Sequence, residues 1–150
     1  MKNMNIGTIL GVFLIFAGVV ILILAMCRPN DINVTGNSLV ISGSYSMTLD
    51  LNKIHSAELT DSLPKITLRT NGISVGEIQV GHFRMKDIGK CRLYLNLNYP
   101  PYVHIVTTQG AHIFFNTKDP ERTKELFSAI MNEVQHTSAP VGNQSNASPE

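Results

Sequence analysis

The stretch Tyr102–Val134, YVHIVTTQGAHIFFNTKDPERTKELFSAIMNEV, decides the fold, because a strand pattern changes within it to a helical one. Two β-rich runs flank Gln109-Gly110, which we interpret as a two-residue hairpin loop with glycine where a positive φ is needed. Asp119-Pro120-Glu121 then predicts a helix start, with Asp as the N-cap and Pro at the first helical position. A single apolar stripe follows at spacings of three and four: Leu126, Phe127, Ile130, Met131 and Val134. Such a stripe must be buried against another element, so the sequence predicts a sheet assembly closed by a C-terminal helix.

The residues before this stretch show repeated strand patterns. In 47–51 and 92–97, apolar and polar residues alternate, which is typical of half-buried strands. Asn71–Gly89 is punctuated by glycines and predicts little regular structure. We interpret these glycines as permitting bulges or tight corners, since their spacing matches no phosphate-binding motif. Shorter β-rich runs lie at 32–35, 39–41, 54–59 and 66–69, so that seven or eight short strands are expected.

A different pattern lies near the N-terminus. Ile6–Met26, IGTILGVFLIFAGVVILILAM, contains no charged residue. As a helix it would span about 31 Å, close to the ~30 Å hydrocarbon core of a bilayer. It is longer than the apolar region of a signal peptide, lacks an A-x-A-like cleavage site and is apolar on every face, unlike a core helix. We therefore predict an N-terminal transmembrane helix and a single-pass membrane protein. Lipidation of Cys27 is an alternative, although Met26 is not the small residue that a bacterial lipoprotein motif has before its cysteine.

The charges next to this helix bear on its orientation. Lys2 and the terminal amine lie on one side and Arg28 on the other. By the positive-inside rule this difference favours a cytoplasmic N-terminus and an extracytoplasmic domain. The last residues are polar and rich in Pro, Gly, Asn and Ser, a composition typical of disorder. The predicted organisation is a membrane anchor at 1–28, a β domain at 29–136 and a disordered polar tail at 137–150.

The formal net charge of +1 is unevenly distributed. The segment 62–118 carries seven cations against two acids, whereas 29–61 carries one against four and 119–150 carries two against five. A cation near an anionic bilayer surface contributes ~1 kcal/mol of binding free energy. The basic residues are therefore a candidate contact surface for anionic lipid headgroups or for a partner, with an ordinary solvated strand face as the alternative. They are Lys65, Arg69, Arg84, Lys86, Lys90 and Arg92.

Other chemistry has little support in the sequence. The two cysteines form no CxxC motif, no serine lies in a nucleophile motif, and the acids show no paired spacing. We predict no catalytic residue, no metal site and no cofactor, and we expect Cys91 to be a small buried residue. With a two-residue hairpin loop, His104 and His112 would lie on opposite faces of the hairpin, which argues against a shared metal. Nucleic-acid binding would require a stronger positive charge.

Several short motifs occur in one order along the domain: Arg69-Thr70-Asn71-Gly72, Gly76, Gly81-His82-Phe83-Arg84, Arg92-Leu93-Tyr94, Pro100-Pro101-Tyr102-Val103-His104-Ile105 and Asp119-Pro120-Glu121. Through them the region from Asn33 to Val134 resembles the bacterial PH-domain family. The resemblance implies a pleckstrin-homology-like fold, which is a bent β-sandwich or barrel closed by a C-terminal helix. It also implies a bacterial membrane setting, because members are often attached to membrane helices, and no catalysis. It assigns no binding residues, because the ligands of the family are largely undefined.

The sequence therefore predicts a non-catalytic binding or scaffold module held at the bilayer. It would engage anionic lipid headgroups, or a protein partner through an exposed strand edge or the segment Asn71–Gly89. The alternative is a membrane assembly protein that self-associates through its transmembrane helix. Gly7 and Gly11 form a GxxxG pattern in that helix, and Gly18 lies further along.

Overall fold

The computed structural model describes residues 6–26 and 31–138, with side chains at 6–22 and 31–135. Within these ranges it is mainly β with a C-terminal helix, as predicted, and has nine strands rather than seven or eight. The elements in order are α1 (Ile6–Met26), β1 (Asp31–Thr35), β2 (Ser38–Ser42), β3 (Met47–Asp50), the 3₁₀ helix η1 (Leu51–Lys53), β4 (Ile54–Thr60), β5 (Ile66–Val75), β6 (Ile78–Met85), β7 (Gly89–Asn96), β8 (Tyr102–Thr107), β9 (His112–Phe115) and α2 (Pro120–Ser138).

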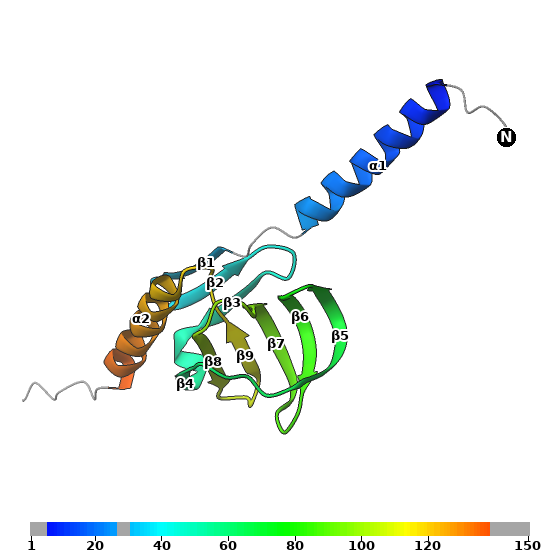
Figure 1. The fold of residues 1–150 in the computed structure, drawn as a ribbon. Coiled ribbons are helices and arrows are strands. Elements are labelled where there is room, and N and C mark those ends of the chain that lie inside the picture. The colour runs from blue at the N-terminus through cyan, green and yellow to red at the C-terminus, as the bar shows by residue number, and fades with distance from the viewer. Residues whose placement is uncertain (1–5, 27–30, 139–150) are drawn as a thin grey trace, which may run out of the picture.

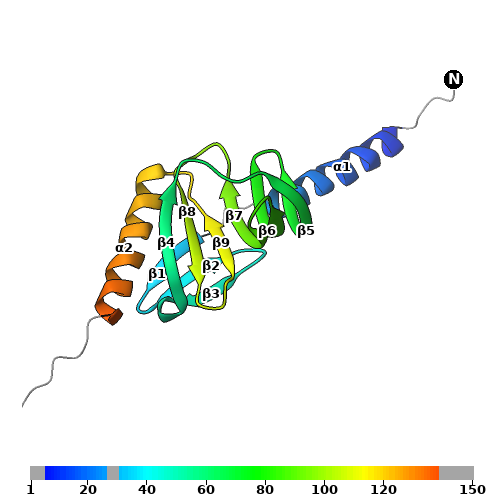
Figure 2. The same ribbon diagram turned by 90° about the horizontal axis from the view of Figure 1, so that it is seen from below.

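The strands form two sheets. A three-stranded sheet has the order β1-β2-β3, and a six-stranded sheet has the order β4-β8-β9-β7-β6-β5. All neighbours are antiparallel except β7 and β9, which are parallel. The small sheet lies against one face of the large one, and α2 lies at the end near β1 and β4 (Figures 1 and 2). The large sheet is therefore not a simple meander, since β9 separates β7 from β8.

Apolar side chains are buried on both faces of the large sheet at its central strands, as β7 shows. Tyr94 points into the core between the two sheets, whereas Leu93 and Leu95 point into a second core on the opposite face. Leu63, in the connection from β4 to β5, packs against this second core. Each fully buried large apolar side chain stabilises the fold by about 1.5–3 kcal/mol. The second core comprises Phe83, Met85, Cys91, Leu93, Leu95, Tyr102 and Phe114.

Helix α2 closes one end of the first core. Its predicted N-cap is confirmed, because the Glu121 backbone N–H donates to Oδ1 of Asp119 at 3.0 Å. The apolar stripe is confirmed as well, since Leu126 and Ile130 are buried in the first core. The helix continues to Ser138, two residues beyond the predicted end of the domain. The rest of the predicted tail, 139–150, lies outside the described residues.

The prediction of little regular structure in Asn71–Gly89 is wrong. The strand β5 continues to Val75, and β6 occupies Ile78–Met85. Gly72 and Gly81 lie inside these strands as cross-strand partners. A Cβ atom at Gly72 would lie 2.4 Å from the Val80 carbonyl oxygen. The glycines thus permit two strands to approach closely, and they do not end them.

The predicted two-residue hairpin loop is also wrong. The Thr107 N–H donates to the Ala111 carbonyl at 2.9 Å, so three residues separate this pair. The register changes by one residue as a result, with His104 opposite Phe114 and His112 opposite Val106. A shift of one residue moves a side chain to the other face of a strand. The two histidines therefore lie on the same face, against the prediction.

The N-terminal stretch forms the predicted helix, α1, over Ile6–Met26. Its large apolar side chains are exposed wherever they are described, with Phe13 66% and Phe16 67% exposed. In the part of the chain that the structure describes, no helix is found to be both long and apolar enough for a membrane span. Lys2, Cys27 and Arg28, on which the orientation and lipidation hypotheses depend, lie outside the described residues.

The close approach of β5 and β6 gives a first prediction. Replacing Gly81 with Ala should destabilise the domain by about 3 kcal/mol, because the backbone is strained there for an L residue and the new Cβ meets main-chain atoms. Gly81 has a φ of +118°, and its Cβ would lie 2.6 Å from the Asn71 carbonyl oxygen. Denaturant unfolding of the full chain in detergent measures the loss. Gly76→Asn is the control, because that turn has space and a φ of +54° that Asn adopts. Equal losses in the two variants would contradict the steric explanation.

Candidate anion-binding site

A cavity of about 310 Å³ lies where β3 and η1 meet the ends of β6, β7 and β9. Three cations line it, Lys53 from η1 and Lys90 and Arg92 from β7, together with two histidines. No aspartate or glutamate is among its lining residues. The lining residues are Met47, Leu49, Lys53, His82, Lys90, Cys91, Arg92, Thr107, Gln109, Ala111, His112 and Ile113. We call this cavity the basic cavity.

Strand register brings the cations together. In the antiparallel pair β6–β7, Arg84 is directly opposite Lys90 and His82 is directly opposite Arg92. Because side chains alternate along a strand, these four residues share one face of the sheet. Like charges directly opposite one another destabilise a sheet. The ion pairs recorded among the described residues join His104 to Glu58, Arg122 to Glu125 and Lys124 to Glu121, so none of them neutralises this face. The arrangement favours an anion.

Two tyrosines contact residues that line the cavity. The Tyr94 hydroxyl donates to the Tyr45 carbonyl at 2.6 Å. Burial raises the pKa of Tyr94, while the nearby charge of Arg92 and a hydrogen bond to it act in the opposite direction. The Tyr45 ring lies edge-on to His82, with centroids 6.3 Å apart, and its hydroxyl donates to Asn71 at 3.0 Å. Arg92 and His82 are thus held by contacts with neutral groups.

Cys91 lines the basic cavity, but its thiol belongs to the second core. Its Sγ atom lies 3.7 Å from the Phe83 carbonyl oxygen. Burial raises the pKa of the Cys91 thiol to about 11. A thiol in this state is neither a good nucleophile nor a metal ligand at neutral pH. The prediction that Cys91 is a small buried residue is confirmed.

A larger cavity of about 450 Å³ lies between β1 and the start of α2. It is lined by charges of both signs, including Asp31, Asp119 and Arg122. The Arg122 guanidinium contacts Glu125 at 3.2 Å and donates to Asn33 at 3.2 Å. Of its two cations, Lys118 and Arg122, the second already has protein partners, and three acids also line the cavity, so it is a weaker candidate for an anion.

The structure divides the basic residues that the sequence singled out. Lys90 and Arg92 line the basic cavity, and Arg84 lies beside Lys90 on the same face. Arg69 lies elsewhere, because it pairs with Phe83, whose side chain is in the second core. Arg69 therefore lies on the opposite face of the sheet.

Lys65 and Lys86 lie together at the turn end of the β6–β7 pair, where the Lys86 N–H donates to the Lys65 carbonyl at 2.8 Å. Neither lines the cavity. Sequence reasoning missed Lys53, His82 and His112. If β6 had been recognised as a strand, the spacing of two residues between His82 and Arg84 would have indicated that they share one face. No local signal marks Lys53, which comes from an acidic segment.

No protein-family model, curated protein or solved structure matches this chain.

The position of Cys91 gives a second prediction. In a Cys27→Ser chain, Cys91 should react with a disulfide reagent near pH 8 about a hundredfold more slowly than an accessible cysteine, because little thiolate forms. The reaction is followed by absorbance, and unfolding in denaturant should restore the full rate. A fast reaction in the folded protein would mean that the thiol is open to the basic cavity.

Proposed function

We propose that this chain is a membrane-tethered, non-catalytic binding module that binds an anionic lipid headgroup in the basic cavity. The observation that carries the proposal is that three cations line this cavity with no acid among them. A phosphate group placed there would relieve the repulsion between cations that share one face of the sheet. The apolar lining beside the cations, which includes Met47 and Leu49, suits the glycerol and acyl portion of a lipid.

The proposed tether is α1. Its support is the uncharged sequence of the whole helix, Ile6–Met26, which has about the length that a bilayer requires. The structure describes the side chains of α1 only as far as Leu22. This part of the helix is shorter than the ~20 residues typical of a transmembrane span. An exposed helix that is apolar all round needs an apolar environment, which lipid supplies. We propose a single pass through a bacterial cell membrane.

We also propose that the domain belongs with the bacterial PH-like domains. The order of its motifs and the combination of two sheets with a C-terminal helix support this assignment. The parallel β7–β9 pair departs from a plain antiparallel sandwich. A protein partner at the exposed β5 edge of the sheet is the competing proposal for what the module binds.

Charge removal in the cavity gives a third prediction. Lys90→Gln with Arg92→Gln should weaken binding of short-chain phosphatidylglycerol about thirtyfold, since each cation contributes ~1 kcal/mol. The full chain would be titrated in micelles of an uncharged detergent, and amide NMR shifts at β7 would be followed.

The matched control is Lys65→Gln with Arg69→Gln, which removes the same charge away from the cavity and should change the affinity little. Short-chain phosphatidylcholine is the lipid control. Equal weakening by both double variants would mean that only the overall charge matters and would contradict a specific cavity. A chain that binds neither lipid would favour the protein-partner proposal.

A second candidate function is self-association through α1. At 3.6 residues per turn, Gly7, Gly11 and Gly18 lie within about 40° of one helix face. A Cβ atom at any of them would meet nothing within 4 Å, so this face is open. A glycine face permits close packing of two helices in a bilayer.

This gives a fourth prediction. Gly7→Ile with Gly11→Ile should abolish association in a membrane reporter assay, because the larger side chains separate the two helices. Ile9→Leu with Val20→Leu, on the opposite face, is the control and should preserve it. An unchanged signal from the glycine variant would exclude this face as the contact.

A further inference from the structure

Two histidines and a glutamate form a chain of hydrogen bonds on the second-core face of the large sheet. The Glu58 carboxylate on β4 lies 2.7 Å from Nδ1 of His104 on β8. Nε2 of His104 lies 3.0 Å from Nδ1 of His112 on β9. The His104 ring stacks on Phe114 with centroids 4.1 Å apart, and its side chain is only 11% exposed. A pair of ionisable rings is thus packed against apolar side chains.

Strand register separates this pair from the cations of the basic cavity. His104 is opposite Phe114 in the β8–β9 pair, and His112 is opposite Cys91 in the β7–β9 pair. Phe114 and Cys91 both belong to the second core, so the two histidine side chains lie on that face. The neighbours of Cys91 on β7 are both cations, and their side chains lie on the other face. The histidine pair is therefore separate from the proposed anion site.

The hydrogen bonds determine where the protons lie in the neutral pair. A carboxylate only accepts, so Nδ1 of His104 must carry the proton that it shares with Glu58. In neutral His104 the other nitrogen, Nε2, then holds a lone pair. Nδ1 of His112 must donate to that lone pair. The neutral pair therefore has one arrangement of protons.

The pair can take up one proton without losing the hydrogen bond between its rings. If His112 takes the charge, its Nδ1 still donates to His104. If His104 takes the charge, its Nε2 becomes the donor and Nδ1 of neutral His112 accepts. A second proton leaves no acceptor, because an N–H of each ring would then face the other at 3.0 Å. The second proton therefore separates the rings.

The connection from β4 to β5 covers the pair and is held at both ends. Leu63 in this connection packs on the second core, and it lines a cavity of about 390 Å³ together with His104. Before it, the Thr60 hydroxyl donates to the Ser62 carbonyl at 3.0 Å and accepts from the Ser62 N–H at 3.3 Å. After it, the Lys65 carbonyl accepts at 2.8 Å from the N–H of the first residue after β6. A buried charge must be hydrated or paired, so hydration of a charged His104 requires this cover to move.

We propose that the His104–His112 pair is an acid-sensitive switch of the second core. The closed core holds the pair with up to one added proton, whereas a second proton breaks the hydrogen bond between the rings and releases the connection around Leu63. Two charged rings with centroids 5.3 Å apart repel each other and take up water through the neighbouring cavity. The switch does not depend on the proposed anion site, which lies on the other face of the sheet.

The surroundings determine the sign of the effect. Burial and the neighbouring His104 lower the pKa of His112. Below about pH 6.5, the ordinary pKa of histidine, the open state therefore binds more protons than the closed state. The stability of the closed core is then lost as the pH falls from that value through the lowered pKa of His112. The titratable groups on the elements packed against the pair are Glu58 on β4, Tyr102 on β8, Cys91 on β7, Asp61 and Lys65 in the connection, and Lys86 and Asp87 in the turn beside Ile88.

Cys91 serves as the probe, because it lies opposite His112 and is buried in the second core. The full Cys27→Ser chain in an uncharged detergent is treated with a pyridyl disulfide, which reacts with thiols even in acid. At each pH, the rate is divided by that of the chain in denaturant. This ratio should rise up to about tenfold for each unit by which the pH falls below about 6.5, because opening takes up one proton. His112→Asn should make the ratio nearly independent of pH, since the amide can still donate to His104 but does not titrate.

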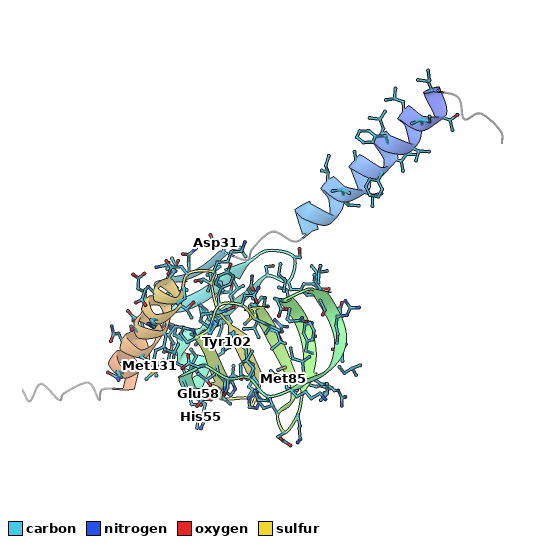
Figure 3. All side chains as sticks on the ribbon, in the orientation of Figure 1. Asp31, His55, Glu58, Met85, Tyr102 and Met131 are labelled. Atoms are coloured by element: carbon cyan, nitrogen blue, oxygen red, sulfur yellow. The ribbon has the colours of Figure 1, made fainter. Side chains whose placement is uncertain are left out.

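His55→Asn is the matched control. His55 is exposed on β4, close in sequence to Glu58 (Figure 3), and its replacement should leave the pH dependence unchanged. Nitrogen NMR of the unsubstituted chain gives an independent readout. A scalar coupling between Nε2 of His104 and Nδ1 of His112 should be present at neutral pH, because they share a hydrogen bond, and should disappear in the acid range in which Cys91 becomes reactive.

The outcomes test the switch independently of lipid binding. The inference fails if the coupling is absent at neutral pH, if it persists while Cys91 becomes reactive, or if His112→Asn retains the pH dependence. Hydrogen exchange of α2, which packs on the first core, separates local opening from unfolding. Loss of protection in α2 over the same pH range would mean that the whole domain unfolds and would also overturn the switch. Loss of phosphatidylglycerol binding would leave it intact.

Discussion

The rest of the structure depends on the parallel pairing of β7 with β9. It places β8 on the far side of β9, so that the chain passes over β9 between β7 and β8. One hydrophobic core lies on each face of the central strands. The pairing starts with Cys91 opposite His112. Gly89 and Lys90 therefore extend past the start of β9 and pair only with β6. The basic cavity lies at this end of the sheet, because no strand fills the space beside that extension.

The same pairing determines the face on which the histidine pair lies. His112 is opposite Cys91 and two residues from Phe114, and both of these belong to the second core, so the His112 side chain lies on that face. There its ring lies beside His104, which stacks on Phe114. Lys90 and Arg92 lie on the other face of β7, which carries Tyr94 of the first core.

The sequence correctly predicted those elements that are determined by residues close together in the chain. The Asp119 cap and the stripe around Leu126 and Ile130 depend only on residues within a few turns of one helix, and both were correct. The strand β6 was not predictable in this way, because a glycine inside a strand pattern usually weakens the strand. Gly81 is tolerated in β6 because its cross-strand partner is another glycine, Gly72. The face on which His112 lies depends on one residue of loop length, and the strand pattern of β8 and β9 fits either register.

The basic cavity was only half predictable for a related reason. Lys90 and Arg92 lie on one strand with the spacing of a shared face, and the sequence shows this directly. Lys53 reaches the same cavity from η1, which is placed by packing against α2 and by the pairing of its neighbours. Such a contact between distant segments is decided by the whole fold. A search for charge clusters along the sequence selects Arg69 instead, which the pleat of β5 puts on the other face.

The energetic balance of the site favours a ligand over a purely structural role. Direct opposition of Arg84 and Lys90 costs a few tenths of a kcal/mol up to about 1 kcal/mol, and a Thr pair at these positions would avoid that cost. Purely structural selection would place an acid opposite one of them, as α2 does with Lys124 and Glu121. Glu58 contacts His104 on the second-core face of the sheet, so it does not neutralise these cations, which lie on the other face.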